Sequence, residues 1–247
     1  MNMKNFEEKI ISYLKKDDVN GILLTGSYAT QTQTEKSDID IRIIFDKNIK
    51  HTIKGVKYID GYKLSYFGEN IDMVKRRMSI DFSRNSRFEA RLFTLGKILY
   101  DKNGYVEELI QYAKIFMENT FQKKTTQDDI ILKMYSLHIR YQSLLHTSIS
   151  DPIYIYNYIS LMKAILITYS LILNSEMVID IKPDKILSNS SYREKNLWKD
   201  FPDSTFVELW IKSITEINPK NMEVIYKYIQ TKTLVIEEKD FEVVYRD

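Results

Sequence analysis

The chain of 247 residues contains no cysteine. This absence excludes disulfides, zinc sites built on thiolates, iron–sulfur clusters and a cysteine nucleophile. Because nothing indicates an oxidising compartment, we expect a cytoplasmic protein. Charge of one sign is also not in excess, with 36 Lys and Arg against 34 Asp and Glu. A balance this even gives no overall attraction to nucleic acid or to an anionic membrane.

Long hydrophobic segments are missing as well. The first nine residues include acidic side chains and no apolar run, so they do not have the pattern of a secretory signal. The most apolar stretch, 161–173, is about one-third too short to cross a bilayer, and Lys163 interrupts it. We therefore expect a buried core helix there and no membrane partner.

Glycine and proline are scarce and separated along the chain. All seven glycines lie at or before Gly104, and all four prolines lie at or after Pro152. Glycine is needed where the backbone makes left-handed turns or approaches a ligand closely. The sequence therefore predicts an α/β (α+β) chain: a small mixed-sheet domain over 1–101, followed by a mainly α-helical domain over 102–247.

Hydrophobic periodicity predicts the elements of each part. In the first part we expect a helix at 5–16, strands at 22–25, 39–45, 56–59 and 62–67, and helices from 71 onward and at 89–99. Asp60-Gly61 between the last two strands is a strong hairpin signal. In the second part we expect helices at 106–120, 128–145, 153–173, 204–217 and 221–232, a connector at 182–185 and a tail hairpin within 233–245.

The segment with the clearest chemical pattern is an acidic pair at the start of an apolar strand. Strand side chains alternate between faces, so Asp38, Asp40 and Arg42 share one face and the intervening isoleucines share the other. Two adjacent carboxylates repel each other unless a cation lies between them. Mg²⁺ is commonly held by one or two carboxylates together with phosphate oxygens. The pair therefore predicts a magnesium site.

Gly26-Ser27, ten residues before the acidic pair, supplies a second set of groups. A glycine at a strand end lets backbone N–H groups approach a phosphate, and a helix start adds a favourable dipole. The Ser27 hydroxyl can donate to a phosphate oxygen. Arg42, beside the aspartates, is either a counter-ion or a phosphate contact. Together these residues predict a nucleoside triphosphate held against a metal ion.

A strand, Gly-Ser, about ten residues and Asp-x-Asp in an apolar strand resemble the nucleotidyltransferase superfamily with the DNA polymerase beta-type palm. The similarity is greatest to bacterial minimal and antibiotic nucleotidyltransferases. The resemblance implies that Gly26 and Ser27 hold phosphates and that Asp38 and Asp40 bind Mg²⁺. It further implies that AMP is transferred from ATP to a hydroxyl of a small molecule such as an antibiotic, in a cleft between the two domains.

One position departs from the family pattern. The family usually has a third carboxylate on a following strand, and Ser65 stands at the matching position. Serine is a poor magnesium ligand and cannot act as a carboxylate base, while Glu69 and Asp72 lie just beyond the strand. Two alternatives therefore stay open. One is a nucleotide-binding regulator with little or no turnover, and the other is a toxin–antitoxin-type nucleotidyltransferase acting on protein or RNA.

Two further groups of side chains have competing interpretations. Arg84, Arg87 and Arg91 have helical spacing, so they would share one face and meet a triphosphate, or form a solvated basic face. Tyrosines at 154, 156 and 158 would line a groove for a sugar or base, or pack in the core.

Overall fold

The computed structural model describes residues 3–123, 125–178, 182–236 and 242. The chain divides into two compact units. The sheet unit comprises Met1–Thr120 and Ser191–Trp198, and the helical unit comprises Phe121–Ser190 and Lys199–Asp247. The first continuous part of the sheet unit thus extends one helix beyond the expected boundary at residue 101.

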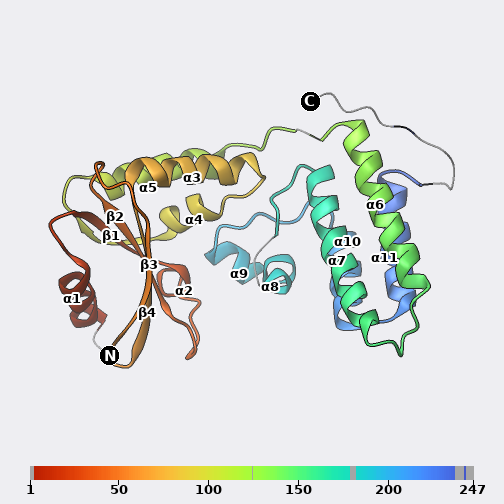
Figure 1. Ribbon diagram of the computed structural model, residues 1–247, viewed down its shortest axis with the longest axis horizontal. Coiled ribbons are helices and arrows are strands. Elements are labelled where there is room, and N and C mark those ends of the chain that lie inside the picture. Colours follow the sequence, from red (N-terminus) through yellow and green to blue (C-terminus); the bar gives the residue numbers. More distant parts are fainter. Residues whose placement is uncertain (1–2, 124, 179–181, 237–241, 243–247) are drawn as a thin grey trace. The chain divides into compact units, whose positions relative to one another are not determined.

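The sheet unit is built on a five-stranded mixed sheet with the order β3-β4-β2-β1-β5 (Figure 1). The strands are β1 (Val19–Thr25), β2 (Ile39–Phe45), β3 (Ile53–Ile59), β4 (Tyr62–Asn70) and β5 (Lys97–Asp101). Strands β2 and β4 are parallel, and the other neighbours are antiparallel. The β3–β4 hairpin turns at Asp60 and Gly61, which both have positive φ angles. A two-residue hairpin of this kind requires that conformation, which Asp-Gly adopts readily.

Strand β5 occupies residues that the periodicity assigns to a helix. Helix α4 (Phe88–Leu95) ends before Gly96, and the chain then pairs with β1. A Cβ atom on Gly96 would lie 2.6 Å from Cδ2 of Leu23, so the backbone passes too close to β1 for a larger residue. The prediction of a helix continuing to residue 99 is therefore wrong.

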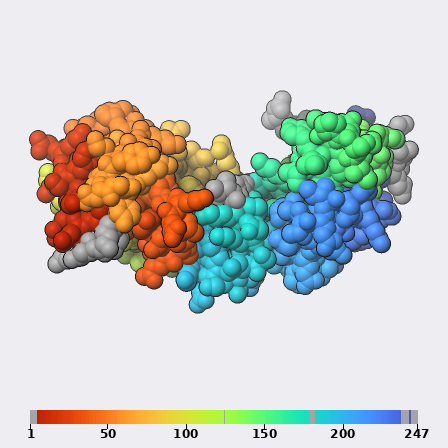
Figure 2. Space-filling view, turned by 90° about the horizontal axis from the view of Figure 1, so that it is seen from below, coloured from red at the N-terminus to blue at the C-terminus, as the bar shows by residue number. Residues whose placement is uncertain are grey.

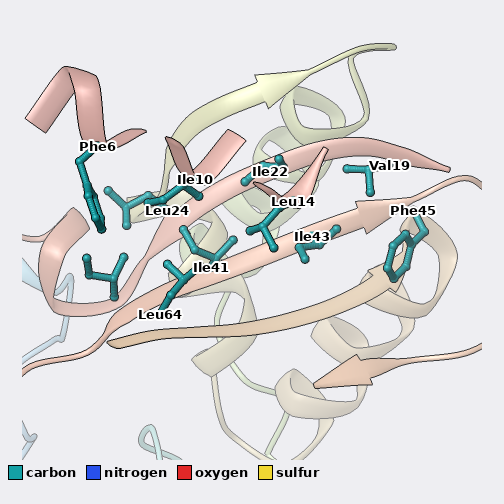
Figure 3. Close-up of a cluster of buried hydrophobic side chains, with 11 residues drawn as sticks. Phe6, Ile10, Leu14, Val19, Ile22, Leu24, Ile41, Ile43, Phe45 and Leu64 are labelled. Carbon is teal, nitrogen blue, oxygen red and sulfur yellow. The ribbon is translucent and has the colours of Figure 1, made fainter. Parts of the chain in front are cut away.

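Helices cover both faces of the sheet. Helix α1 (Met3–Leu14) packs on one face, where its apolar side chains join those of the central strands (Figure 3). Helices α3 (Ile71–Ser83), α4 and α5 (Tyr105–Glu118) pack on the other face. The second core contains residues of β1 and β2 together with Met78, Phe93, Val106, Leu109 and Ala113. Because α5 supplies part of this core, it belongs to the sheet unit.

A short segment from much later in the chain completes the sheet unit. Helix α9 (Ser190–Lys195) is followed by Trp198, and the Arg91 guanidinium of α4 lies 3.7 Å from the centre of the indole ring. A cation positioned over an aromatic face is attracted by the ring. This contact fastens residues 191–198 to α4.

The helical unit contains α6 (Gln127–Leu145), α7 (Ile153–Ile172), α8 (Pro183–Ser188), α10 (Ser204–Thr215) and α11 (Pro219–Lys232). Four of these helices occupy almost the predicted ranges. The green α6 and the blue α11 lie side by side on its surface (Figure 2). The expected connector at 182–185 instead begins α8, because proline is favoured at the first helical position. Most of the expected tail hairpin lies outside the described residues.

Helix α7 is the centre of the helical unit. By length and composition it is, within the described ranges, the one helix that could cross a bilayer. The core helix of a soluble bundle passes the same test, and α7 packs against α6, α10 and α11. Tyr154 and Tyr158 are buried, whereas Tyr156 is exposed. Two of the three tyrosines therefore serve packing, since residues four apart share a helix face.

Candidate functional site

The acidic pair lies where β2 begins. Asp40 is paired with Thr25 of β1 on one side and with Ser65 of β4 on the other. Asp38 precedes the strand by one residue, and its side chain is 36% exposed. The alternating isoleucines are buried in the α1 core, as the pattern predicts: Ile39, Ile41 and Ile43.

Ser65 and Lys63 of β4 both contact Asp38. The Ser65 Oγ donates a hydrogen bond of 2.7 Å to Asp38 Oδ2, and the Lys63 Nζ lies 3.3 Å from the same oxygen. The Ser65 hydrogen bond is the main cause that lowers the pKa of Asp38, and Lys63 lowers it further. Leu64 is fully buried on the opposite side of the strand. Ser65 thus lies beside the acidic pair, where its alignment with the family pattern places it.

Gly26 lies directly against the second aspartate. It follows β1 and has a φ of +65°, and a Cβ atom built there would lie 2.2 Å from Asp40 Oδ2. An L-residue at this position would be strained in backbone and would collide with the carboxylate. Ser27, the next residue of the short helix α2 (Gly26–Ala29), is partly exposed. The structure therefore brings the Gly-Ser turn and the acidic pair together.

Arg42 is a counter-ion, and it pairs with Glu89. Its Nη2 lies 2.9 Å from Glu89 Oε2 of α4, and both side chains are largely buried. The guanidinium also lies 4.7 Å from the centre of the Phe67 ring. The structure thus assigns Arg42 to a pair between the sheet and α4.

Sequence reasoning missed Glu89. Burial raises the pKa of Glu89, and the nearby Arg42 opposes this shift. Its Oε1 is buried with no hydrogen-bond partner among the described residues. The two members of the pair are 47 residues apart, so local spacing could not reveal it.

The three arginines expected on one helix face do not share one. Helix α3 ends at Ser83 and α4 begins at Phe88, with Asn85 between them at a φ of 56°. Arg87 donates to the carbonyl oxygens of Phe116 and Asn119, at 2.9 and 2.7 Å. Arg91 lies on Trp198. The expectation of a common triphosphate-binding face is therefore wrong, because a left-handed residue interrupts the helix.

Glu69 and Asp72 do not replace a third carboxylate at the acidic pair. Glu69 is buried and binds Arg77, whose Nε lies 3.0 Å from Glu69 Oε2. It pairs with Ile44, four residues beyond Ser65, which corresponds to about 13 Å along a strand. Asp72 is exposed in the first turn of α3. Across the described ranges, no cluster of three or more His, Asp or Glu side chains could hold a metal ion.

The acidic pair nevertheless fits one magnesium ion. Two carboxylates suffice for Mg²⁺ when phosphate oxygens and water complete its coordination. The hydrogen bond from Ser65 favours the ionised form of Asp38, which is the form that binds a cation. The close approach of Gly26 to Asp40 leaves no side chain between the turn and the carboxylate.

Comparison with known proteins identifies the domain that carries this site. Residues 8–105 match the family model described as polymerase beta, nucleotidyltransferase. The sheet unit carries a nucleotidyltransferase domain. The matched range contains all five strands and the Gly-Ser and Asp-x-Asp motifs, so this region of the chain belongs to the nucleotidyltransferase superfamily.

Among solved structures, a nucleotidyltransferase-like protein from Exiguobacterium sibiricum resembles the chain with 12% sequence identity and a TM-score of 0.40. The similarity covers 94% of this chain and 77% of that one. No curated protein matches the sequence. The assignment of the nucleotidyltransferase domain rests on the family match.

Proposed function

We propose that the protein catalyses Mg²⁺-dependent transfer of AMP from ATP to a hydroxyl of a small molecule such as an antibiotic. One observation supports this proposal above all. A nucleotidyltransferase domain holds Asp38 and Asp40 on one sheet face, with Gly26 against the second carboxylate. In the reaction the acceptor oxygen bonds to the α-phosphorus, the bond to the β-phosphate breaks, and pyrophosphate leaves.

Each residue of the site has a separate task in this proposal. Asp38 and Asp40 hold the metal ion, which neutralises charge on the triphosphate when it is bound. The Gly26 backbone and the Ser27 hydroxyl hold phosphate oxygens. Ser65 and Lys63 orient the Asp38 carboxylate and favour its ionised form. The hydroxyl proton passes to a basic group of the acceptor or to water, because serine is too weak a base and the described residues bring no third carboxylate to the pair.

A second candidate function follows from Ser65. A site with two carboxylates can bind a metal–nucleotide complex without activating an acceptor hydroxyl. The protein would then be a nucleotide-binding regulator of the same fold. This candidate differs from the first in one measurable property: nucleotide binds, but pyrophosphate is not released.

Pyrophosphate release tests both candidates. The protein is incubated with ATP, Mg²⁺ and a panel of hydroxyl-bearing compounds, and magnesium-dependent ATP binding is measured by calorimetry in parallel. We expect Asp38→Asn and Asp40→Asn to lower turnover roughly 100-fold or more, or about 3 kcal/mol in the barrier. Asp72→Asn, which changes an exposed carboxylate outside the site, should leave turnover unchanged. Full activity in either variant of the pair would contradict the proposal, and binding without turnover would favour the regulator.

A further inference from the structure

Three neighbouring strands place a regular array of side chains on the face that carries the acidic pair. Asp40 of β2, Ser65 of β4 and Val56 of β3 form one row across the sheet. In the adjacent row, Lys63 is paired with Tyr58 and contacts Asp38. Directly opposed residues project to the same face. The edge strand β3 therefore continues the site away from the aspartates.

The outer part of this array is open. Val56 is 52% exposed and Tyr58 is 68% exposed, although both are large apolar or aromatic side chains. On the other face of β3, the Lys57 ammonium lies 4.9 Å from the centre of the Tyr13 ring of helix α1. An aromatic ring exposed on a sheet face is a common platform for stacking a planar or sugar ring.

The spacing of the array suits a small acceptor. Neighbouring strands are about 4.8 Å apart, so Val56 lies about 10 Å across the sheet from Asp40. A single ring resting on Tyr58 and Val56 can extend a hydroxyl over Ser65 toward the acidic pair. The same row therefore holds a surface for a ring and the carboxylates at which we propose the transfer occurs.

A cationic side chain lies between the exposed ring and the acidic pair. Lys63 of β4 is half-exposed, is paired with Tyr58 and contacts Asp38. Lys63 binds Asp38 at 3.3 Å in a partly exposed pair, an arrangement worth at most about 1 kcal/mol. Its ammonium can thus exchange partners at little cost, and a ligand anion placed beside Tyr58 would meet it.

We propose that Val56, Tyr58 and Lys63, here called the β3–β4 face, form the acceptor subsite. It binds a ring-bearing alcohol that also carries a phosphate or carboxylate group. The ring stacks on Tyr58, the anionic group binds Lys63, and the hydroxyl points to the aspartates. This proposal rests on the proposed nucleotidyl transfer and narrows its acceptor to ring alcohols that carry an anionic group.

The test uses ligand-observed NMR on the full chain with Mg²⁺ and α,β-methylene-ATP, an analogue that cannot transfer AMP. Three matched compound sets are screened: ring alcohols bearing phosphate or carboxylate, the neutral parent alcohols, and their amine-bearing counterparts. We expect binding from the anionic set. Tyr58→Ala should weaken it about tenfold, Tyr58→Phe should preserve it, and Lys63→Met should remove the preference for anions. Ile115→Ser, an exposed apolar residue of α5, is the matched control.

The outcomes separate this proposal from the one on which it rests. Binding of the analogue with Mg²⁺ is recorded in the same samples, and its loss in Asp40→Asn tests the nucleotide site alone. If the analogue binds but amines dominate, no set binds, or Tyr58→Ala changes nothing, the acceptor subsite is overturned and the nucleotide site stands. If the analogue does not bind, the proposed function itself fails. Melting curves of the exposed-site variants should match that of the unchanged protein.

Discussion

The start of β2, here called the open end, and the part of the strand from Arg42 onward, here called the covered end, carry charged side chains on the same sheet face in different environments. At the open end, Asp38 is 36% exposed and is held by a serine and a lysine. At the covered end, Arg42 and Glu89 form a pair in which the Glu89 side chain is 2% exposed. A buried charge without its partner is costly, so the covered end contains matched charges. The open end leaves its acidic pair accessible to ions and ligands.

A second ion pair between a helix and the sheet lies beside the covered end, on strand β4. Arg77 of α3 binds Glu69 of β4, and Arg42 and Arg77 lie 4.7 and 5.0 Å from the centre of the same Phe67 ring. Two helices are thereby attached to the sheet through charged groups. The comparison indicates that the charges of this face have two separate tasks, attachment of helices at one end and ligand binding at the other.

Glu89→Ala should give the largest loss of stability. The change leaves the buried Arg42 guanidinium without its carboxylate, and breaking such a pair lowers the free energy of unfolding by about 3–5 kcal/mol. Chemical denaturation measures this loss. The double variant Arg42→Met with Glu89→Leu should lose much less, because no uncompensated charge stays behind. A loss below about 1 kcal/mol for the single variant would show that the pair does not attach α4 to the sheet.

Gly26→Ala should have the next largest effect, and it acts at the open end. The new methyl group would meet Asp40 Oδ2 in a backbone of positive φ, which we expect to cost about 1–3 kcal/mol and to weaken nucleotide binding. Gly61→Ala is a matched control, since Gly61 also has a positive φ but nothing within 4 Å of its Cβ position. Equal nucleotide affinity in both variants would contradict a role for the Gly26 turn. Calorimetry with ATP and Mg²⁺ makes the comparison.

Ser65→Ala should change the acid–base behaviour of the open end. The lowered pKa of Asp38 contributes stability above the unfolded pKa, about 3.9, which is lost as the pH falls through the folded pKa. Without the Ser65 hydroxyl, the pKa of Asp38 should rise toward its unfolded value. The contribution of Asp38 to stability at higher pH should then be smaller, and its loss should be complete at a higher pH.

NMR titration of the Asp38 carboxyl group measures this shift directly. Denaturation at pH 7 and at a pH below both pKa values measures its consequence, since the contribution of this group is present only at the higher pH. Lys63→Met should shift the pKa in the same direction by a smaller amount. An unchanged pKa in Ser65→Ala would remove the hydrogen bond as its cause.

Lys9→Ala should have the smallest effect. Lys9 pairs with Asp60 of the hairpin turn, and both side chains are more than half exposed. Solvent and salt screen such pairs, so we expect a change within about 0.5 kcal/mol. A thermal unfolding curve is sufficient to measure it. A loss comparable to that of Glu89→Ala would mean that solvent exposure does not determine how much an ion pair contributes to the free energy of unfolding of this protein.

Sequence reasoning could predict what depends on local periodicity. Alternation along β2 and β4 places Asp38, Asp40 and Ser65 on one face, and the structure brings them together as predicted. The long helices follow from their apolar spacing for the same reason. The family pattern added the expectation that Gly26 and Ser27 hold phosphates and that Asp38 and Asp40 bind Mg²⁺.

Tertiary contacts account for what could not be predicted. Glu89 meets Arg42 only because α4 packs on the sheet. The short apolar run of β5 is compatible with the periodicity of a helix and with that of a strand, and only its pairing with β1 decides between the two. The prediction that the three arginines share one helix face is wrong because the helix is interrupted at Asn85. The left-handed conformation of Asn85 cannot be inferred from the spacing of the arginines.

The contact between Arg91 and Trp198 determines when, during synthesis, the sheet unit can complete its folding. Residues 1–120 leave the ribosome before the segment that completes their unit, which ends 78 residues later (198 − 120). At roughly 5–20 residues per second, this delay is about 4–16 s. During that interval the nascent domain carries α4 without its tryptophan partner. Stalling translation before Trp198, and again far enough beyond it for Trp198 to have left the ribosome, would show by limited proteolysis when the domain becomes resistant.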